Sequence, residues 1–123
     1  MVKIKRAYEI PARGDGKRVL VDRLWPRGLT RRRAAIDHWA KELGPSHALR
    51  KWFGHDPRRW AEFRRRYRLE LRPQRKVLEA LARRAANGPV TLVYGARDTA
   101  HNDAVVLERM LERVHPRRSG RRR

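Results

Sequence analysis

Two short, unbroken apolar segments constrain the fold of this chain more than any other feature. Val19, Leu20 and Val21 follow one another without a polar residue, and residues 90–94 read Val-Thr-Leu-Val-Tyr. An apolar run without alternation is typical of a strand that is covered on both faces, as in a parallel sheet. Residues 2–8, where Val2 and Ile4 alternate with lysines, predict a further strand.

Helical signals fill most of the sequence between these strands. Thr30 and Ser46 are expected to cap short helical segments, and Asp56 followed by Pro57 predicts the start of a longer helix. Pro73 restarts a helix that ends at residues 87–89, with Gly88 expected in the left-handed conformation. A last helix is predicted from about Asn102 to Val114.

Two apolar stripes support the two middle helices. The first consists of Trp60, Phe63, Tyr67 and Leu71, and the second of Val77, Leu78, Leu81, Ala82 and Ala85.

The order strand, strand, helices, strand, helix predicts the α/β class. We expect a single small three-layer or two-layer domain over residues 1–116, with a mostly parallel sheet flanked by helices. Residues 36–43 stay open at this point. Ile36, Trp39 and Leu43 have helical spacing, whereas a short strand that ends before Gly44 fits the same residues.

The chain is strongly basic. Its 33 Lys and Arg against 13 Asp and Glu give a formal net charge of +20, and five arginines lie in residues 117–123. That terminal run has nothing apolar to bury and is predicted to be a disordered arginine-rich tail. The excess of arginine fits either recognition of phosphate or a genome rich in arginine codons. Non-specific attraction to nucleic acid is expected in both cases.

Several classes of protein are excluded or disfavoured by what the sequence lacks. There is no Cys, hence no disulfide, thiolate metal site or cysteine nucleophile. The histidines show no pair at i, i+4, and the glycine-rich phosphate loops of nucleotide-binding proteins are missing, so neither a metal nor a cofactor is expected. No apolar run could span a membrane, and the first twenty residues lack a signal core, which predicts a cytoplasmic protein.

Polar loops follow the two best strands and form the candidate site. Ligands of parallel α/β sheets collect beyond the carboxyl ends of the strands. After residues 19–21 the chain offers Arg23 and Arg27 to clamp an anion, with Trp25 as a stacking face and Gly28 for close approach of the backbone. If the two strands are neighbours, this loop shares one edge of the sheet with the loop after Tyr94.

The loop after Tyr94 contains Asp98, His101 and Asn102. His101 oriented by Asp98 is a candidate acid–base pair, and Tyr94 and Asn102 are candidate ligand contacts. The alternative is structural: Asp98 caps the last helix and Asn102 belongs to the same cap. The loop after residues 19–21 has a structural alternative as well, in which Arg23 pairs with Asp22 and Trp25 fills the core.

His55 is the remaining candidate ligand contact. It lies between Gly54 and Asp56 on a predicted loop, and loops on rigid scaffolds often carry function. The neighbouring Trp52 and Phe53 are expected to anchor the core.

The motifs resemble one bacterial family. Residues 21–29 (Val-Asp-Arg-Leu-Trp-Pro-Arg-Gly-Leu), residues 49–57 (Leu-Arg-Lys-Trp-Phe-Gly-His-Asp-Pro), Trp60 with Phe63 and Tyr67, and His101-Asn102 are similar to the YeaO-like family of uncharacterised proteins. The resemblance spans residues 2–114 and implies a small α/β protein, with no catalytic set to carry over. It also favours a strand at residues 36–39.

Two functions follow as hypotheses. The first is binding, with or without turnover, of a small anionic or phosphorylated ligand at the strand-end edge. The alternative is non-sequence-specific binding of nucleic acid through the arginine-rich helix at residues 58–72 and the tail.

Overall fold

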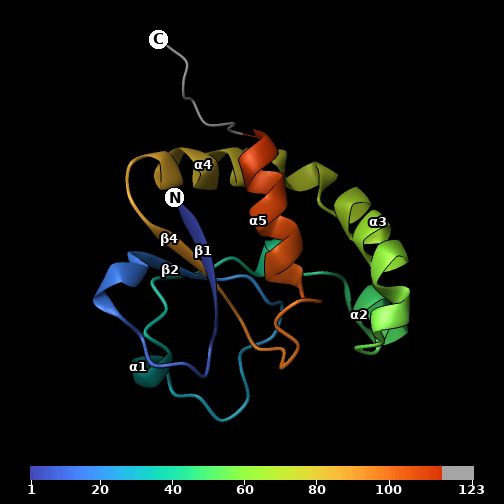
Figure 1. Ribbon diagram of the computed structural model, residues 1–123, viewed down its shortest axis with the longest axis horizontal. Helices are drawn as coiled ribbons and strands as arrows, with labels where there is room; N and C mark the ends of the chain where they lie inside the picture. Colours follow the sequence, from blue (N-terminus) through green and yellow to red (C-terminus); the bar gives the residue numbers. More distant parts are fainter. Residues whose placement is uncertain (115–123) are drawn as a thin grey trace.

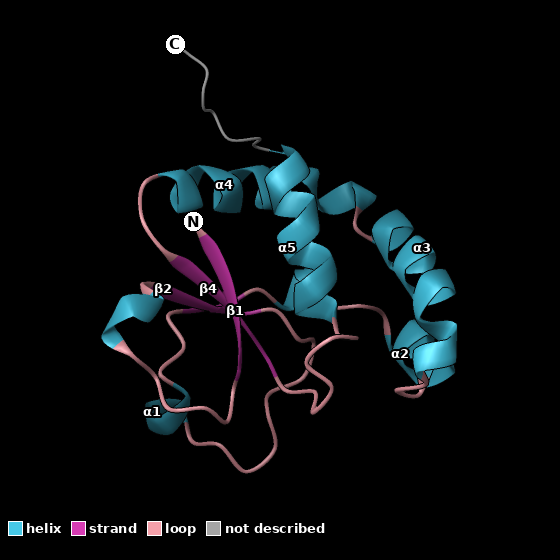
Figure 2. Cartoon of the chain, in the orientation of Figure 1, coloured by secondary structure: helices cyan, strands magenta, loops and turns pink. Residues whose placement is uncertain are grey.

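β4 (Val90–Tyr94) is a central strand of a four-stranded, entirely parallel sheet. It pairs with β1 (Val2–Arg6) on one side and with β2 (Lys17–Leu20) on the other, and β3 (His38–Trp39) extends the sheet beyond β2. The computed structural model in Figures 1 and 2 describes residues 1–114. The predicted α/β class and parallel sheet are confirmed, while the tail predicted at residues 117–123 lies outside the described residues.

Residues 1–114 form five α-helices: α1 (Arg31–Ala34), α2 (His47–Phe53), α3 (Trp60–Glu70), α4 (Arg75–Ala86) and α5 (Asp103–Val114). The predicted caps are confirmed: the Thr30 and Ser46 side chains accept hydrogen bonds from the backbone N–H groups of Arg33 and Leu49. Asp56 accepts the backbone N–H of Arg58 in the same way and starts the turn that leads into α3. None of the helices in the described part of the chain is long and apolar enough to cross a membrane.

The two faces of the sheet are covered differently. On one face, Val19, Leu92 and Tyr94 belong to the larger core, which α2, α3, α4 and α5 complete. On the other face, Leu20 and Val93 pack under an irregular segment that contains α1. Both faces are therefore covered, and this explains why β2 and β4 are apolar without alternation.

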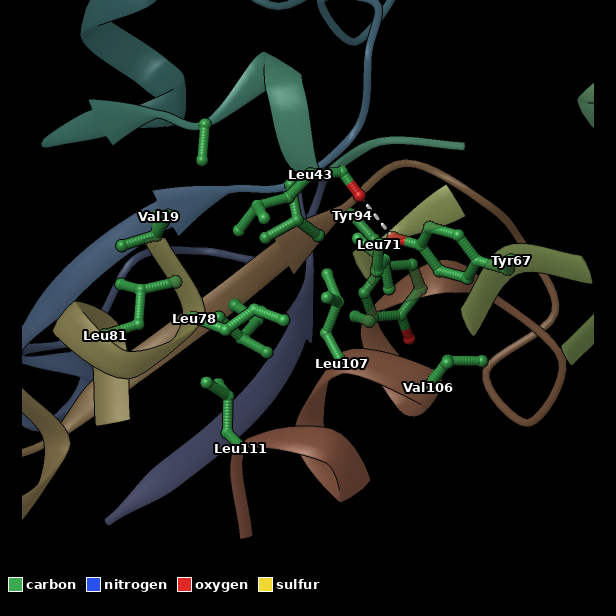
Figure 3. Close-up of a cluster of buried hydrophobic side chains, with 14 of the residues drawn as sticks. Val19, Leu43, Tyr67, Leu71, Leu78, Leu81, Tyr94, Val106, Leu107 and Leu111 are labelled. Carbon is green, nitrogen blue, oxygen red and sulfur yellow. Dashed lines mark hydrogen bonds between the residues drawn. The ribbon is translucent and has the colours of Figure 1, made fainter. Parts of the chain in front are cut away.

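Tyr67 of α3 joins the helical layer to the segment that follows β3. Its side chain is fully buried, and its hydroxyl donates a hydrogen bond to the backbone carbonyl of Leu43 (Figure 3). Leu43 lies in a short 3-10 turn directly before Gly44 and Pro45. The bond thus holds a loop that leads into α2 against the core.

Two local expectations are refined by the structure. Residues 36–43 contain both a two-residue strand at His38–Trp39 and a 3-10 turn at Lys41–Leu43, so neither a single helix nor a single long strand is present. The expectation for Gly88 is wrong, because among the described residues the glycines with positive φ are Gly16, Gly28 and Gly54. Helix α4 ends at Ala86, and its C-cap Asn87 has an ordinary φ of −104°.

Replacing Tyr67 by Phe tests the role of this hydrogen bond. Tyr67→Phe leaves the buried carbonyl of Leu43 without its partner, which costs about 1–2 kcal/mol in the free energy of unfolding. Tyr8→Phe is the matched control, because the exposed Tyr8 hydroxyl bonds the carbonyl of Arg27 where water can replace it. Urea denaturation of both variants measures the difference, and equal stabilities would contradict the assigned role.

Candidate functional site

The pairing of β2 with β4 brings the two polar loops together. The strands are adjacent and parallel, with Val19 opposite Leu92 and Leu20 opposite Val93. The loops that follow them therefore leave the same edge of the sheet. This edge is where ligands of parallel sheets bind, as the sequence analysis expects.

A pocket of about 640 Å³ lies at this edge. Three segments form the pocket: the loop after β2, helix α2 with the residues that flank it, and the segment from the end of β4 to the start of α5. Tyr8 and Phe63 of α3 each add one side chain. The lining residues are Tyr8, Asp22, Arg23, Leu24, Trp25, Pro26, Arg27, Pro45, His47, Arg50, Lys51, Phe53, His55, Phe63, Gly95, Ala96, His101, Asn102 and Asp103.

Most of the candidate residues from the sequence lie along this pocket. Those that line it are Arg23, Trp25, Arg27, His55, His101 and Asn102. Gly28, Tyr94 and Asp98 lie outside its lining. Gly28 has a φ of +81° in the turn closed by the bond from the Leu29 N–H to the Pro26 carbonyl. Tyr94 is buried in the core, and Asp98 acts on its neighbours in the loop.

Arg23 is fixed by the backbone of the neighbouring loop. Its Nε donates to the carbonyl of Pro45 at 3.0 Å and its Nη2 to the carbonyl of Gly44 at 2.7 Å. The two backbones also lie close together, because a Cβ atom on Gly44 would lie 2.5 Å from the backbone nitrogen of Arg23. Arg23 therefore holds the loop at Gly44 and Pro45 in place in the wall of the pocket. Its guanidinium bonds these two carbonyls instead of pairing with Asp22, the alternative that the sequence left open.

Asp22 makes a different contact, across the sheet edge. Its Oδ2 accepts the backbone N–H of Gly95 at 2.8 Å. A Cβ atom on Gly95 would lie 3.2 Å from the same oxygen, so a small residue suits this position. This bond ties the end of β2 directly to the end of β4.

The Asp22 side chain also meets the carboxyl group of Asp103, the first residue of α5. Burial, followed by the negative charge of Asp22 and its side-chain contact, holds the pKa of Asp103 well above its usual range. Asp103 is 9% exposed and lines the pocket together with Asp22. These two carboxyl groups form what we call the floor of the pocket.

This carboxyl pair is not among the site residues predicted from the sequence. Asp22 enters there only as the alternative partner of Arg23, and no role is predicted for Asp103. The available signal was position: Asp22 is the second residue after β2, and Asp103 opens the helix after the loop that follows β4. Acidic side chains after adjacent parallel strands are expected to approach each other.

His101 and Asp98 form a second pair beside the pocket. His101 Nδ1 lies 2.9 Å from Asp98 Oδ2, and Asp98 Oδ1 accepts the backbone N–H groups of Ala100 and His101. The bond from the Ala100 backbone, followed by that from the His101 side chain, lowers the pKa of Asp98. A neutral imidazole that donates from Nδ1 keeps Nε2 as an acceptor. Trp60 contacts the ring edge-on, at 5.2 Å between centroids.

Asn102 is the cap of α5. Its Oδ1 accepts the N–H of Val105 at 3.0 Å, and its Nδ2 donates to the carbonyl of Asp98 at 2.9 Å. Asn102 therefore provides the helix cap that one alternative gave to Asp98, and Asp98 organises the preceding turn.

The mouth of the pocket is basic. Arg23, Arg27 and Lys51 are exposed and Arg50 is half-buried, and all four line the pocket. Phe53 and Phe63 supply buried aromatic walls and stack on each other with centroids 4.4 Å apart. Within residues 1–114, no group of three or more His, Asp or Glu side chains is placed to hold a metal ion.

Comparison with known proteins assigns the family. The family model of the inactive DUF488-N3 subclade matches residues 1–122. The chain belongs to this subclade. The resemblance to YeaO-like proteins is also confirmed: the uncharacterized protein YeaO of Escherichia coli (strain K12) is 42% identical over 106 residues, which cover 86% of this chain and 92% of that protein.

Two mycobacterial members of the comparison are nearly as similar. The uncharacterized proteins Rv3073c of Mycobacterium tuberculosis (strain H37Rv) and Mb3100c of Mycobacterium bovis are each 38% identical over 110 residues, covering 89% of this chain and 92% of theirs. No solved structure matches the chain.

The carboxyl pair predicts an unusual dependence of stability on pH. A raised pKa in the folded state means that Asp103 adds stability at pH values below its unfolded pKa, and this contribution is lost as the pH rises through the folded pKa. Asp103→Asn removes that dependence and keeps a donor for Asp22. The variant should gain stability relative to the wild type as the pH rises above the unfolded pKa of about 4 towards the raised pKa of the folded state, by up to about 1.4 kcal/mol per pH unit.

Thermal or urea unfolding at several pH values measures this difference. Glu112→Gln is the control, because Glu112 is an exposed carboxylate on the same helix. A difference between Asp103→Asn and the wild type that stays constant with pH would contradict the raised pKa of Asp103.

Proposed function

We propose that this protein binds a small anionic or phosphorylated ligand in the pocket at the carboxyl edge of its sheet. The observation that carries the proposal is the set of four cationic side chains at the pocket mouth: Arg23, Arg27, Arg50 and Lys51. The pocket volume of about 640 Å³ falls within the range of roughly 300–1,000 Å³ that is typical of small-molecule sites.

The cations differ in the part they are suited to play. Arg23 is held by two hydrogen bonds through Nε and Nη2, so its guanidinium is oriented before a ligand arrives and has further N–H groups to offer. Arg27 and Lys51 are exposed at the mouth and would close on an anion by charge-assisted hydrogen bonds. Such bonds contribute about 1.5–3 kcal/mol each.

The family description supports a binding role over turnover. The matching model is described as an inactive subclade, so retention of a pocket without catalysis is the simplest function consistent with it. The assignment of His101 and Asp98 as an acid–base pair stays a prediction. Their geometry also suits a binding role, because Asp98 fixes the orientation of a ring that lines the pocket.

Non-sequence-specific binding of nucleic acid has weaker support. The net charge of +20 favours it. However, the arginines around α3 already have partners: Arg58 and Arg59 lie against Asp56, and Arg65 and Arg66 against Glu62. Side-chain hydrogen bonds from Arg65 and Arg66 lower the pKa of Glu62 to about 2. The helix face thus carries fewer free cations than its sequence suggests.

Binding of pyrophosphate tests the proposal. We expect calorimetry to detect binding to the wild type, and Arg27→Gln or Arg50→Gln to weaken it by about 1.5–3 kcal/mol, which is about 10- to 150-fold. Arg83→Gln removes the same charge from an exposed position of α4 outside the pocket and should leave the affinity nearly unchanged. Arg23 is avoided because its loss would also release the loop at Gly44.

Two results would contradict the proposal. One is equal loss of affinity in Arg83→Gln and Arg27→Gln, which would indicate attraction to net charge alone. The other is a failure of pyrophosphate to bind while duplex DNA does, with an affinity that falls with salt by about 0.9 logarithmic units per contacted phosphate. If Arg65→Gln but not Arg27→Gln then weakens binding of DNA, the nucleic-acid alternative is favoured.

A further inference from the structure

The two ends of the pocket have opposite chemical character. The mouth carries exposed cations, whereas the most buried polar residues of the lining are Asn102 at 4% exposed and Asp103 at 9%. Asn102 uses its oxygen and its nitrogen to cap α5 and to bond the Asp98 carbonyl. The carboxyl groups of Asp22 and Asp103 are therefore the polar groups of the floor that remain to meet a ligand.

The floor would repel the anionic part of a ligand. Two carboxyl groups line this end of the pocket and one of them is buried, so a further negative charge placed beside them would be strongly unfavourable. An anion must therefore bind at the mouth, beside Arg27, Arg50 and Lys51. The ligand needs a second, different group to reach the floor.

The floor is suited to hydroxyl groups. A carboxylate accepts hydrogen bonds and a protonated carboxyl group also donates one, so a hydroxyl group, which both donates and accepts, can pair with either form. Oδ2 of Asp22 already accepts the Gly95 N–H. The other carboxyl oxygens of Asp22 and Asp103 remain available to a ligand. An ammonium group would satisfy the acceptors but would have to pass four cations at the mouth, which disfavours a cationic ligand.

The size and walls of the pocket agree with a ligand larger than a bare anion. A volume of about 640 Å³ accommodates a molecule with several carbon atoms between its two polar ends. The buried rings of Phe53 and Phe63 line the pocket, and aromatic faces of this kind pack against the C–H groups of such a molecule.

Building on the proposed function, we infer that the ligand is a sugar phosphate, with its phosphate on Arg27, Arg50 and Lys51 and its hydroxyl groups hydrogen-bonded to the Asp22–Asp103 pair. The cationic mouth sets the affinity for phosphate, and the carboxyl pair selects polyhydroxylated molecules over other phosphate esters.

Calorimetric titration with matched phosphates tests this inference. The probes are ribose 5-phosphate, glucose 6-phosphate and glycerol 3-phosphate, compared with pentyl phosphate, which has a carbon chain without hydroxyl groups, and with inorganic phosphate. We expect at least one of the three hydroxylated probes to bind tenfold or more tightly than pentyl phosphate.

Variants of Asp103 assign the preference to the carboxyl pair. Asp103→Ala should reduce the advantage of the hydroxylated probe to less than threefold and leave the affinity for inorganic phosphate within twofold. Asp103→Asn, which keeps both a donor and an acceptor, should retain most of the advantage. Circular dichroism confirms that each variant is folded, and the comparison of probes on the wild type is informative by itself.

The outcomes separate this inference from the proposed function. If all the phosphate esters bind equally and Arg27→Gln weakens them, the selection of hydroxyl groups is overturned and the anion site stands. If the advantage persists in Asp103→Ala, the carboxyl pair is not its origin and the inference fails. If neither phosphate, pyrophosphate nor any of the esters binds, both proposals are overturned.

Discussion

The structure of the candidate site depends on one hydrogen bond between the ends of two neighbouring strands. The backbone N–H of Gly95, just after β4, donates to Oδ2 of Asp22, just after β2. The bond is possible because β2 and β4 are adjacent, parallel and in register, so both chains leave the sheet at the same level. It fixes the Asp22 carboxyl group in the position where α5 delivers Asp103.

This arrangement places groups together that would repel each other in water at neutral pH. The helix that carries Asp103 is held by its own cap at Asn102, and burial beside Asp22 raises the pKa of Asp103. Burying two carboxyl groups together costs free energy, and a polar pair of this kind rarely stabilises a fold more than an apolar one. The proposed role in recognition gives this costly arrangement a purpose.

Local patterns predicted much of the fold and half of the site. The caps at Thr30 and Ser46 and the buried strands could be predicted because each depends on residues that are close in sequence. The basic edge of the site followed from the rule that ligands bind beyond parallel strands. The pairing of Asp22 with Asp103 could not be derived in the same way, because it depends on the register of β2 against β4 and on where α5 begins. The contribution of α2 to the mouth, through Arg50 and Lys51, depends likewise on packing between distant segments.

We propose that the loops after β2 and β4, with α2, form one site for an anion. Mapping of backbone amide shifts by NMR during titration with pyrophosphate shows directly where the anion binds. We expect the largest changes in residues 22–27, 47–55 and 95–103, while the amides of α3 and α4 change little. Changes centred on the arginines of α3 and α4, or spread evenly over all basic surfaces, would contradict it.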